Sequence, residues 1–111
     1  MTVTVTVLVP AQTANNTQST VYTATGVTAI IDKFTATNYS ALAATISVNL
    51  VNPAGTASND DLIVKTKTLQ AGETYIFPEL VGHVLRPGGF ISTLAGTASA
   101  INIRVSGREV T

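Results

Sequence analysis

The chain carries few side chains with which chemistry could be done. Its 111 residues include no cysteine, no tryptophan and a single histidine, and only 11% are charged. An enzyme must position acids, bases, nucleophiles or metal ligands, so this composition argues against a catalyst and predicts neither a cofactor nor a metal centre. Without cysteine no disulfide can form, so stability must come from packing and hydrogen bonds alone.

Charge is scarce and also balanced. Six basic and six acidic residues give a formal charge of zero, so no long-range field would attract nucleic acid or an anionic membrane, and neither is expected as a partner. The N-terminus lacks the basic and apolar blocks of a signal peptide, which predicts synthesis and folding in a cytoplasm. A neutral chain in which 45% of residues are hydrophobic should be sticky as a free monomer. We therefore expect further copies or a larger assembly to cover part of its surface.

The residues that are abundant, above all threonine, valine, alanine, serine and asparagine, favour strands and turns. Residues 2–9 alternate strictly between threonine and valine before Leu8, which is the strongest local signal for a strand. Pro10 is predicted to end this strand, because proline cannot donate a hydrogen bond to a ladder. Residues 11–20 are polar and are expected to form a loop or arm. The single domain thus divides into an N-terminal strand and arm, 1–20, and a sandwich body, 21–111.

The rest of the chain predicts more strands, at 21–25, 27–39, 44–51, 62–69, 74–77, 90–94 and 100–106. Seven or eight short strands with turn signals about every 8–12 residues indicate a single antiparallel β-sandwich, all-β in class. Periodicity does not choose between a jelly roll and an immunoglobulin-like sandwich. One short helical turn is expected near 79–85, because Pro78 and Glu79 suit the first turn of a helix.

Two groups of residues could hold a metal ion, but each has an ordinary alternative. Glu79 and His83 would share a face of the expected helix, and such a pair is more often a weak surface contact than a ligand set. Asp60 and Asp61 lack the alternate-position spacing of a calcium loop and suit a solvated turn. We expect no metal at either place.

Residues 2–20 are the best candidate for contact with another chain. An alternating strand followed by a polar arm can pair with an exposed sheet edge on a neighbour. It can equally be an ordinary first strand with a long loop, and the sequence does not decide between these interpretations. The interface residues expected in this stretch are Val3, Val5, Val7, Asn15 and Asn16.

Basic residues supply a second candidate contact. Arg104 and Arg108 are four residues apart in a predicted strand, so they should share one face. Together with Lys65 and Lys67, which are also predicted to share a face, they could form a small basic patch. The patch would be either a solvated surface or a contact with acidic groups of a neighbouring subunit, and we include Arg104 and Arg108 in the expected interface.

Several turn and strand motifs follow one another in the second half of the chain. They are an "AGETY" turn at 71–75, a Leu-x-Pro-Gly turn at 85–88, a small-residue loop at 95–100 and a closing "SGREVT" strand at 106–111. In this order they resemble small β-sandwich virion proteins of tailed bacteriophages, of the capsid cement or decoration type, and residues 29–50 are similar as well. Gly88-Gly89 departs from the more polar Gly-Asp or Gly-Glu of such proteins.

The resemblance implies a structural protein of the virion, made in the cytoplasm of a bacterial host. Its most direct form is a cement protein that oligomerises with itself and stabilises the shell by bridging subunits of the major capsid protein. A neck, tail or fibre component is the alternative. A carbohydrate-binding β-sandwich module is a second alternative, for which Tyr39 or Tyr75 would have to supply an aromatic platform.

Overall fold

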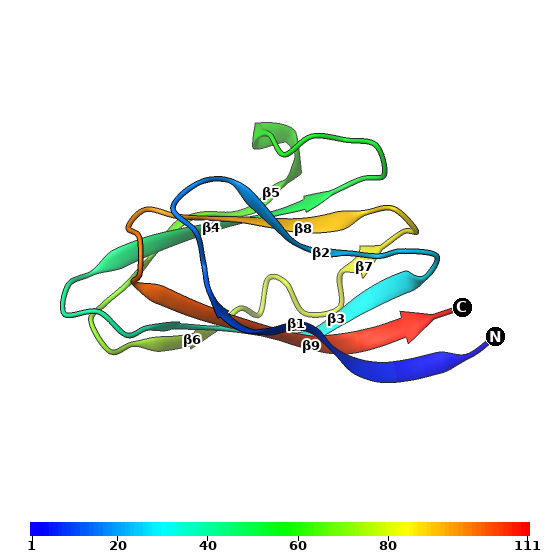
Figure 1. Cartoon of the computed structure of the whole chain (residues 1–111), viewed down its shortest axis with the longest axis horizontal. Helices are drawn as coiled ribbons and strands as arrows, with labels where there is room; N and C mark the ends of the chain where they lie inside the picture. The colour runs from blue at the N-terminus through cyan, green and yellow to red at the C-terminus, as the bar shows by residue number, and fades with distance from the viewer.

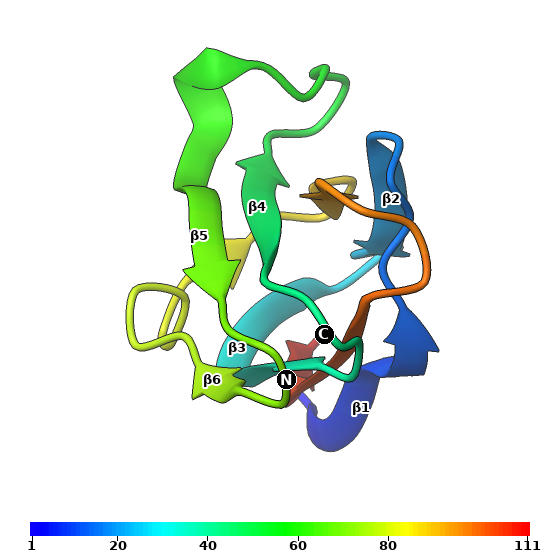
Figure 2. The same ribbon diagram turned by 90° about the vertical axis from the view of Figure 1, so that its left-hand side faces the viewer.

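Two antiparallel β-sheets pack face to face in the computed structural model, which describes all residues from Met1 to Thr111 (Figures 1 and 2). The all-β sandwich expected from the sequence is confirmed. The strands are β1 (Val3–Thr13), β2 (Ser19–Thr23), β3 (Thr28–Asn38), β4 (Ala44–Val51), β5 (Leu62–Leu69), β6 (Thr74–Ile76), β7 (Val84–Leu85), β8 (Phe90–Ala95) and β9 (Ile101–Val110). The first sheet has the order β1-β9-β3-β6, with β7 beside β3, and the second sheet has the order β2-β8-β4-β5.

This strand order decides between the two expected topologies. Apart from the two-residue β7, eight strands cross between the sheets at every connection except that from β4 to β5. Each sheet therefore interleaves early and late strands, which is the arrangement of a double-sheet jelly roll. The chain ends, β1 and β9, become neighbours in the first sheet, so the two termini lie side by side (Figure 1).

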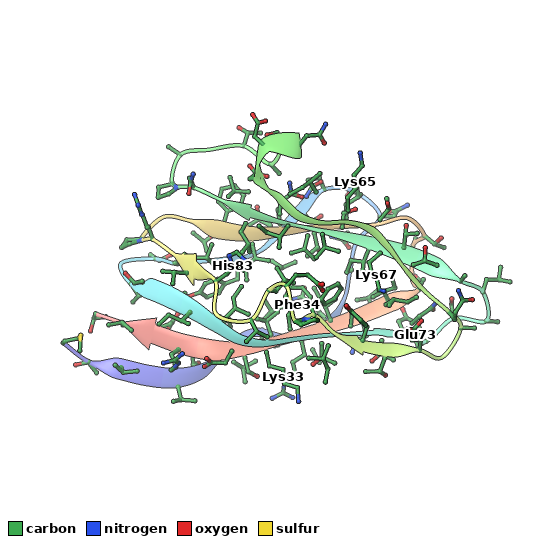
Figure 3. The ribbon with its side chains drawn as sticks, turned by 180° about the vertical axis from the view of Figure 1, so that it is seen from behind. Lys33, Phe34, Lys65, Lys67, Glu73 and His83 are labelled. Atoms are coloured by element: carbon green, nitrogen blue, oxygen red, sulfur yellow. The ribbon has the colours of Figure 1, made fainter.

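The core lies between the two sheets and is built from side chains of their inner faces. Phe34 of β3 meets Phe77 edge to face, with 5.2 Å between ring centroids, and Figure 3 shows Phe34 in the middle of the sandwich. Ile46 on β4, Ile91 on β8 and Ile103 on β9 are completely buried as well. Alternation within each strand supplies this layer, because every second side chain points to the same face.

The first strand differs from its prediction. It does not end at Pro10 but continues to Thr13 through two register shifts against β9, one after Val7 and one after Val9. Proline is tolerated here because β1 is an edge strand, so the missing N–H removes no bond to a second neighbour. Residues 14–18 connect the two sheets, and Leu8, Val9 and Ala14 are buried in the core. The N-terminal segment is thus part of the sandwich.

The helical turn expected near 79–85 is not formed, which corrects that part of the prediction. Successive turns fill the segment instead, and the backbone N–H of Gly82 donates to the carbonyl of Ile31 on β3 (2.7 Å) while His83 accepts from Ile31 (3.0 Å). Binding to β3 replaces helical hydrogen bonds, and Gly82 has a φ of +86°, outside the helical region. The one helical turn lies at Asn59–Asp61, and no helix is long and apolar enough to cross a membrane.

Candidate interaction surface

The three valines expected at an interface lie on the outer face of the first sheet. Val3, Val5 and Val7 are exposed, and Val5 retains 81% of its accessible surface. The ends of β1 and β9 project past the strands of the second sheet in Figure 1, and the three valines face away from that sheet. The alternation of β1 therefore leaves an uncovered apolar row beside solvent.

The backbone of β1 has hydrogen-bonding groups that point away from the sheet. Thr2 exchanges both of its backbone bonds with Thr111, at 3.0 and 2.9 Å, and the register then pairs each following residue of β1 with the preceding one of β9. In an antiparallel ladder such bonded pairs alternate with unbonded ones. The N–H and C=O groups of Val3, Val5 and Val7 are accordingly directed toward the free edge.

The other three sheet edges are protected in ways that β1 is not. Strand β6 has three residues, and β2 has five with a register shift after Thr20. Strand β5 carries two lysines and a bulge at Thr66, a residue with φ of +46°. Short strands, bulges and lysines are the usual means of preventing edge pairing. Strand β1 lacks them over Thr2–Val7, and no charged side chain precedes Asp32 in the sequence.

Arg104 and Arg108 lie on the same outer face, as their spacing predicted. Their register partners on β3 are Thr35 and Ile30. Arg108 forms a bidentate ion pair with Asp32, with nitrogen–oxygen distances of 2.9 to 3.2 Å. This hydrogen-bonded carboxylate raises the pKa of Arg108. Arg104 is exposed and forms no ion pair, so it remains a free cation on this face.

The four basic residues do not form one patch, which corrects the expectation. Lys65 points away from the sandwich on the outer side of the second sheet, whereas Lys67 lies between β5 and β6 (Figure 3), with its Nζ 4.4 Å from the centroid of the Tyr75 ring. The bulge at Thr66 breaks the alternation that would have kept the two lysines together. Lys65 and Lys67 belong to β5 of the second sheet, whereas Arg104 and Arg108 belong to β9 of the first.

The remaining predicted residues are dispersed. Asn15 and Asn16 lie in the connection after β1, at the opposite end of that strand from Val3, and the Asn15 side chain bonds Ser19 Oγ at 3.1 Å. Tyr75 contacts Lys67 and Phe77, so its ring is already occupied. These residues do not combine into one surface with the valines.

The candidate metal ligands do not form a metal site: Glu79 and Asp61 are hydrogen-bonded within the protein, and His83 belongs to no cluster of potential ligands. Glu79 accepts a hydrogen bond from the Tyr75 hydroxyl at 3.2 Å, and His83 is an exposed residue between the turn at 78–82 and β7 (Figure 3). Asp61 caps the single helical turn: its Oδ1 accepts from the backbone N–H of Ser58 (3.1 Å) and from Asn49 Nδ2 (2.6 Å). No group of three or more potential ligands is close enough together to hold a metal ion.

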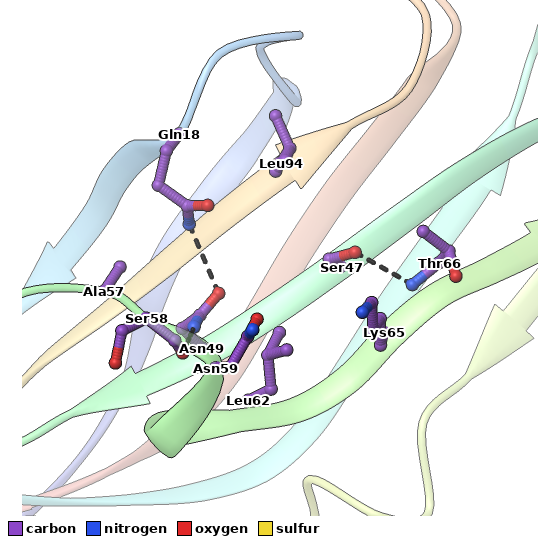
Figure 4. A pocket seen from close by; sticks show the side chains of 10 residues that line it. All are labelled: Gln18, Ser47, Asn49, Ala57, Ser58, Asn59, Leu62, Lys65, Thr66 and Leu94. Atoms are coloured by element: carbon purple, nitrogen blue, oxygen red, sulfur yellow. Dashed lines mark hydrogen bonds between the residues drawn. The ribbon is translucent and has the colours of Figure 1, made fainter.

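A cluster of buried polar residues was not predicted. Ser47, Asn49 and Ser92 lie on the outer face of the second sheet but are at most 6% exposed. Gln18 covers them by donating from Nε2 to Asn49 Oδ1 (3.3 Å) and to Ser92 Oγ (2.7 Å). Polar and apolar residues alternate along β4, and this pattern alone indicates that the polar face is solvated. Only the fold brings Gln18 over the polar residues and buries them. A cavity of about 300 Å³ opens beside this cluster (Figure 4).

Comparison with known proteins gives no relatives: no family model, curated protein or solved structure matches the chain.

Proposed function

We propose that this protein is a structural virion component of a tailed bacteriophage, of the capsid cement type, and that it associates with itself through β1. The observation that carries the proposal is the uncharged free edge of β1, with its exposed valines and outward-directed backbone groups. The motifs resembling phage virion proteins supply the context, and the jelly roll supports it because that architecture recurs in viral capsid proteins. Such architecture is an analogy and does not by itself specify a function.

The edge of β1 is complementary to a second copy of itself. In an antiparallel pair about a two-fold axis at Val5, Val3 of each copy faces Val7 of the other, which would form about six backbone hydrogen bonds. The outer face would then carry a continuous row of valines, with cross-strand apolar pairs stabilising the sheet. Since β1 has no charged side chain, no like charges oppose one another in this symmetric arrangement.

Pairing through β1 joins the first sheets of two copies into one extended surface. The outer face of that surface carries Lys33 and Arg104, both exposed and without ion pairs, and Figure 3 shows Lys33 pointing away from the sandwich. These cations suit acidic groups on the neighbouring shell subunit. A dimer that presents two such faces can bridge two subunits, and repetition around a symmetric shell multiplies a modest contact.

The first test is the mass of the protein in solution. We expect twice the 11.5 kDa of one chain by light scattering, and a monomer for Val5→Lys, because the two new lysines would meet at the two-fold axis. Val84→Lys is the matched control: Val84 is also exposed on the outer face of the first sheet but lies on β7, away from the free edge. A monomeric wild type, or a dimeric Val5→Lys variant, would contradict self-association through β1.

The second test separates cement from other places in the particle. Purified particles should contain the protein at a copy number comparable with that of the major capsid protein, and empty shells should bind added protein. Only as many copies as a single ring of subunits contains would place the protein in the neck or tail and contradict the cement assignment. Binding to shells should weaken in Lys33→Ala and Arg104→Ala, while the solution mass of both variants stays that of the dimer.

A further inference from the structure

The cavity on the outer side of the second sheet has walls from three separate parts of the chain (Figure 4). Its floor is the buried polar row of β4, one wall is the loop around Ser58 and Asn59, and another is the bulge of β5 at Thr66. Thr66 is β-branched and has φ of +46°, a conformation that costs such a residue roughly 1–2 kcal/mol. The hydroxyl of Ser47 holds it there by accepting the Thr66 N–H at 2.8 Å.

Several polar groups around the cavity have no partner in the protein. Asn49 is fully engaged, because its amide donates to Ser58 O (2.9 Å) and Asp61 Oδ1 (2.6 Å). In contrast, the Ser47 hydroxyl only accepts a hydrogen bond, so its own proton is free to be donated. The side-chain amide of Asn59 and the Oε1 of Gln18 make no hydrogen bond within the protein. Free hydrogen-bond donors and one free acceptor therefore surround the opening, while the floor of the cavity is fixed by the hydrogen bonds of Asn49.

The charge and the apolar side chains of the lining restrict the chemical class of ligand further. Lys65 is the one charged residue that lines the cavity, and it has no ion pair. Leu62 of β5 and Leu94 of β8 line the same cavity and are partly exposed. A pyranose ring combines apolar C–H faces with hydroxyl groups at its edges, and a carboxylate on it would match the lysine.

We propose that this cavity binds a single acidic sugar residue, a uronic-acid type pyranose, independently of the association through β1. The volume is at the lower end of ligand cavities, which extend from about 300 to 1,000 Å³, so one ring fits and a chain of sugars does not. Lys65 pairs with the carboxylate, Ser47 and Asn59 donate to hydroxyl oxygens, and Gln18 Oε1 accepts from a hydroxyl. The leucines contact the ring carbons.

The test is a titration of the purified protein with glucuronate, glucose and N-acetylglutamate, followed by amide chemical shifts. Glucuronate should bind with a Kd near the millimolar range expected for one small polar ligand, about 1 mM, and shift the amides of 57–59, 65 and 66. Glucose and N-acetylglutamate should bind at least about tenfold more weakly, since each lacks either the charge or the ring.

Variants complete the test. Lys65→Met should weaken glucuronate binding by about tenfold, and Asn59→Ala should weaken it as well. Lys67→Met is the matched control, because that lysine is on the same strand but stacks on Tyr75 outside the cavity. Equal binding of glucose, tighter binding of N-acetylglutamate, an unchanged Kd in Lys65→Met, or no amide shift with glucuronate would each overturn the proposal. Because Val5→Lys leaves the cavity intact, its glucuronate titration separates this site from the β1 edge.

Discussion

At the scale of single residues, most polar side chains inside the sandwich have partners. Asn38 is completely buried, yet its amide donates to the carbonyls of Leu42 (2.8 Å) and Leu69 (3.0 Å), and its oxygen accepts from Ser40. Thr93 is the exception, because its Oγ1 is buried without any hydrogen-bond partner. An unpaired hydroxyl in an apolar layer keeps its desolvation cost without a compensating bond.

Replacing that hydroxyl should stabilise the protein. Thr93 faces the core from β8, opposite Val48 of β4, so Thr93→Val keeps the shape and removes the unpaired group. We expect the free energy of unfolding to rise by about 1 kcal/mol, measured as a higher urea midpoint at an unchanged slope. Thr45→Val, on the outer side of β4, is the control and should change little. A lower midpoint for Thr93→Val would mean that the hydroxyl has a partner.

At the scale of elements, glycine determines how closely three strands of the first sheet approach. Gly107 on β9 pairs with Thr6 of β1 and Ile31 of β3. A Cβ at this position would fall on the carbonyl oxygen of Ile30 and lie 2.8 Å from the Leu8 side chain. The sequence places this glycine inside a predicted strand, where its role becomes visible only from the neighbouring strands.

The substitution Gly107→Ala should therefore be strongly destabilising. The backbone of β3 would have to move, at a cost of about 3 kcal/mol, which thermal and urea unfolding would both report. Gly26→Ala is the comparison: Gly26 has φ of +68° but open space around it, so about 1 kcal/mol is expected from backbone conformation alone. Equal losses for the two variants would contradict the close approach of β3 and β9.

At the scale of the whole molecule, one hydrogen bond joins the two sheets near the chain ends. The hydroxyl of Tyr22 on β2 donates to Glu109 Oε2 on β9 at 2.5 Å. Burial, then this bond and the charge of Glu109, raise the pKa of Tyr22 above its ordinary value. The folded state thus favours the protonated phenol, and the corresponding stability is fully present below the unfolded pKa of about 10.

The contribution of Tyr22 should disappear in alkali. As the pH rises from about 10 toward the raised pKa of the folded state, the unfolded state loses its proton first and stability falls. Tyr22→Phe should cost about 1 kcal/mol at neutral pH, and its difference from the wild type in urea unfolding should shrink at high pH. Tyr75, whose pKa is also raised, is present in both proteins and cancels. A difference that stays constant with pH would contradict the role of the bond.

Much of the fold follows from local pattern. The bounds of β4 and β5 are those predicted, because β-branched alternation and flanking turn residues act over a few positions. The helical turn near Pro78 and the strand end at Pro10 were wrong for one reason: both inferences treated the segment in isolation. Hydrogen bonds to Ile31 replace the helical turn near Pro78, and the position of β1 at the sheet edge lets that strand continue through Pro10.

The sequence alone determined the fold class. Few reactive side chains, balanced charge and strands with alternating residues specify a small β-sandwich. Which valines are uncovered, which edge lacks protection and which polar residues line a cavity depend on strand order. That order brings β1 beside β9 and Gln18 over Asn49, residues far apart in the chain. Only tertiary structure decides such contacts, because their energy arises between segments that local periodicity does not relate.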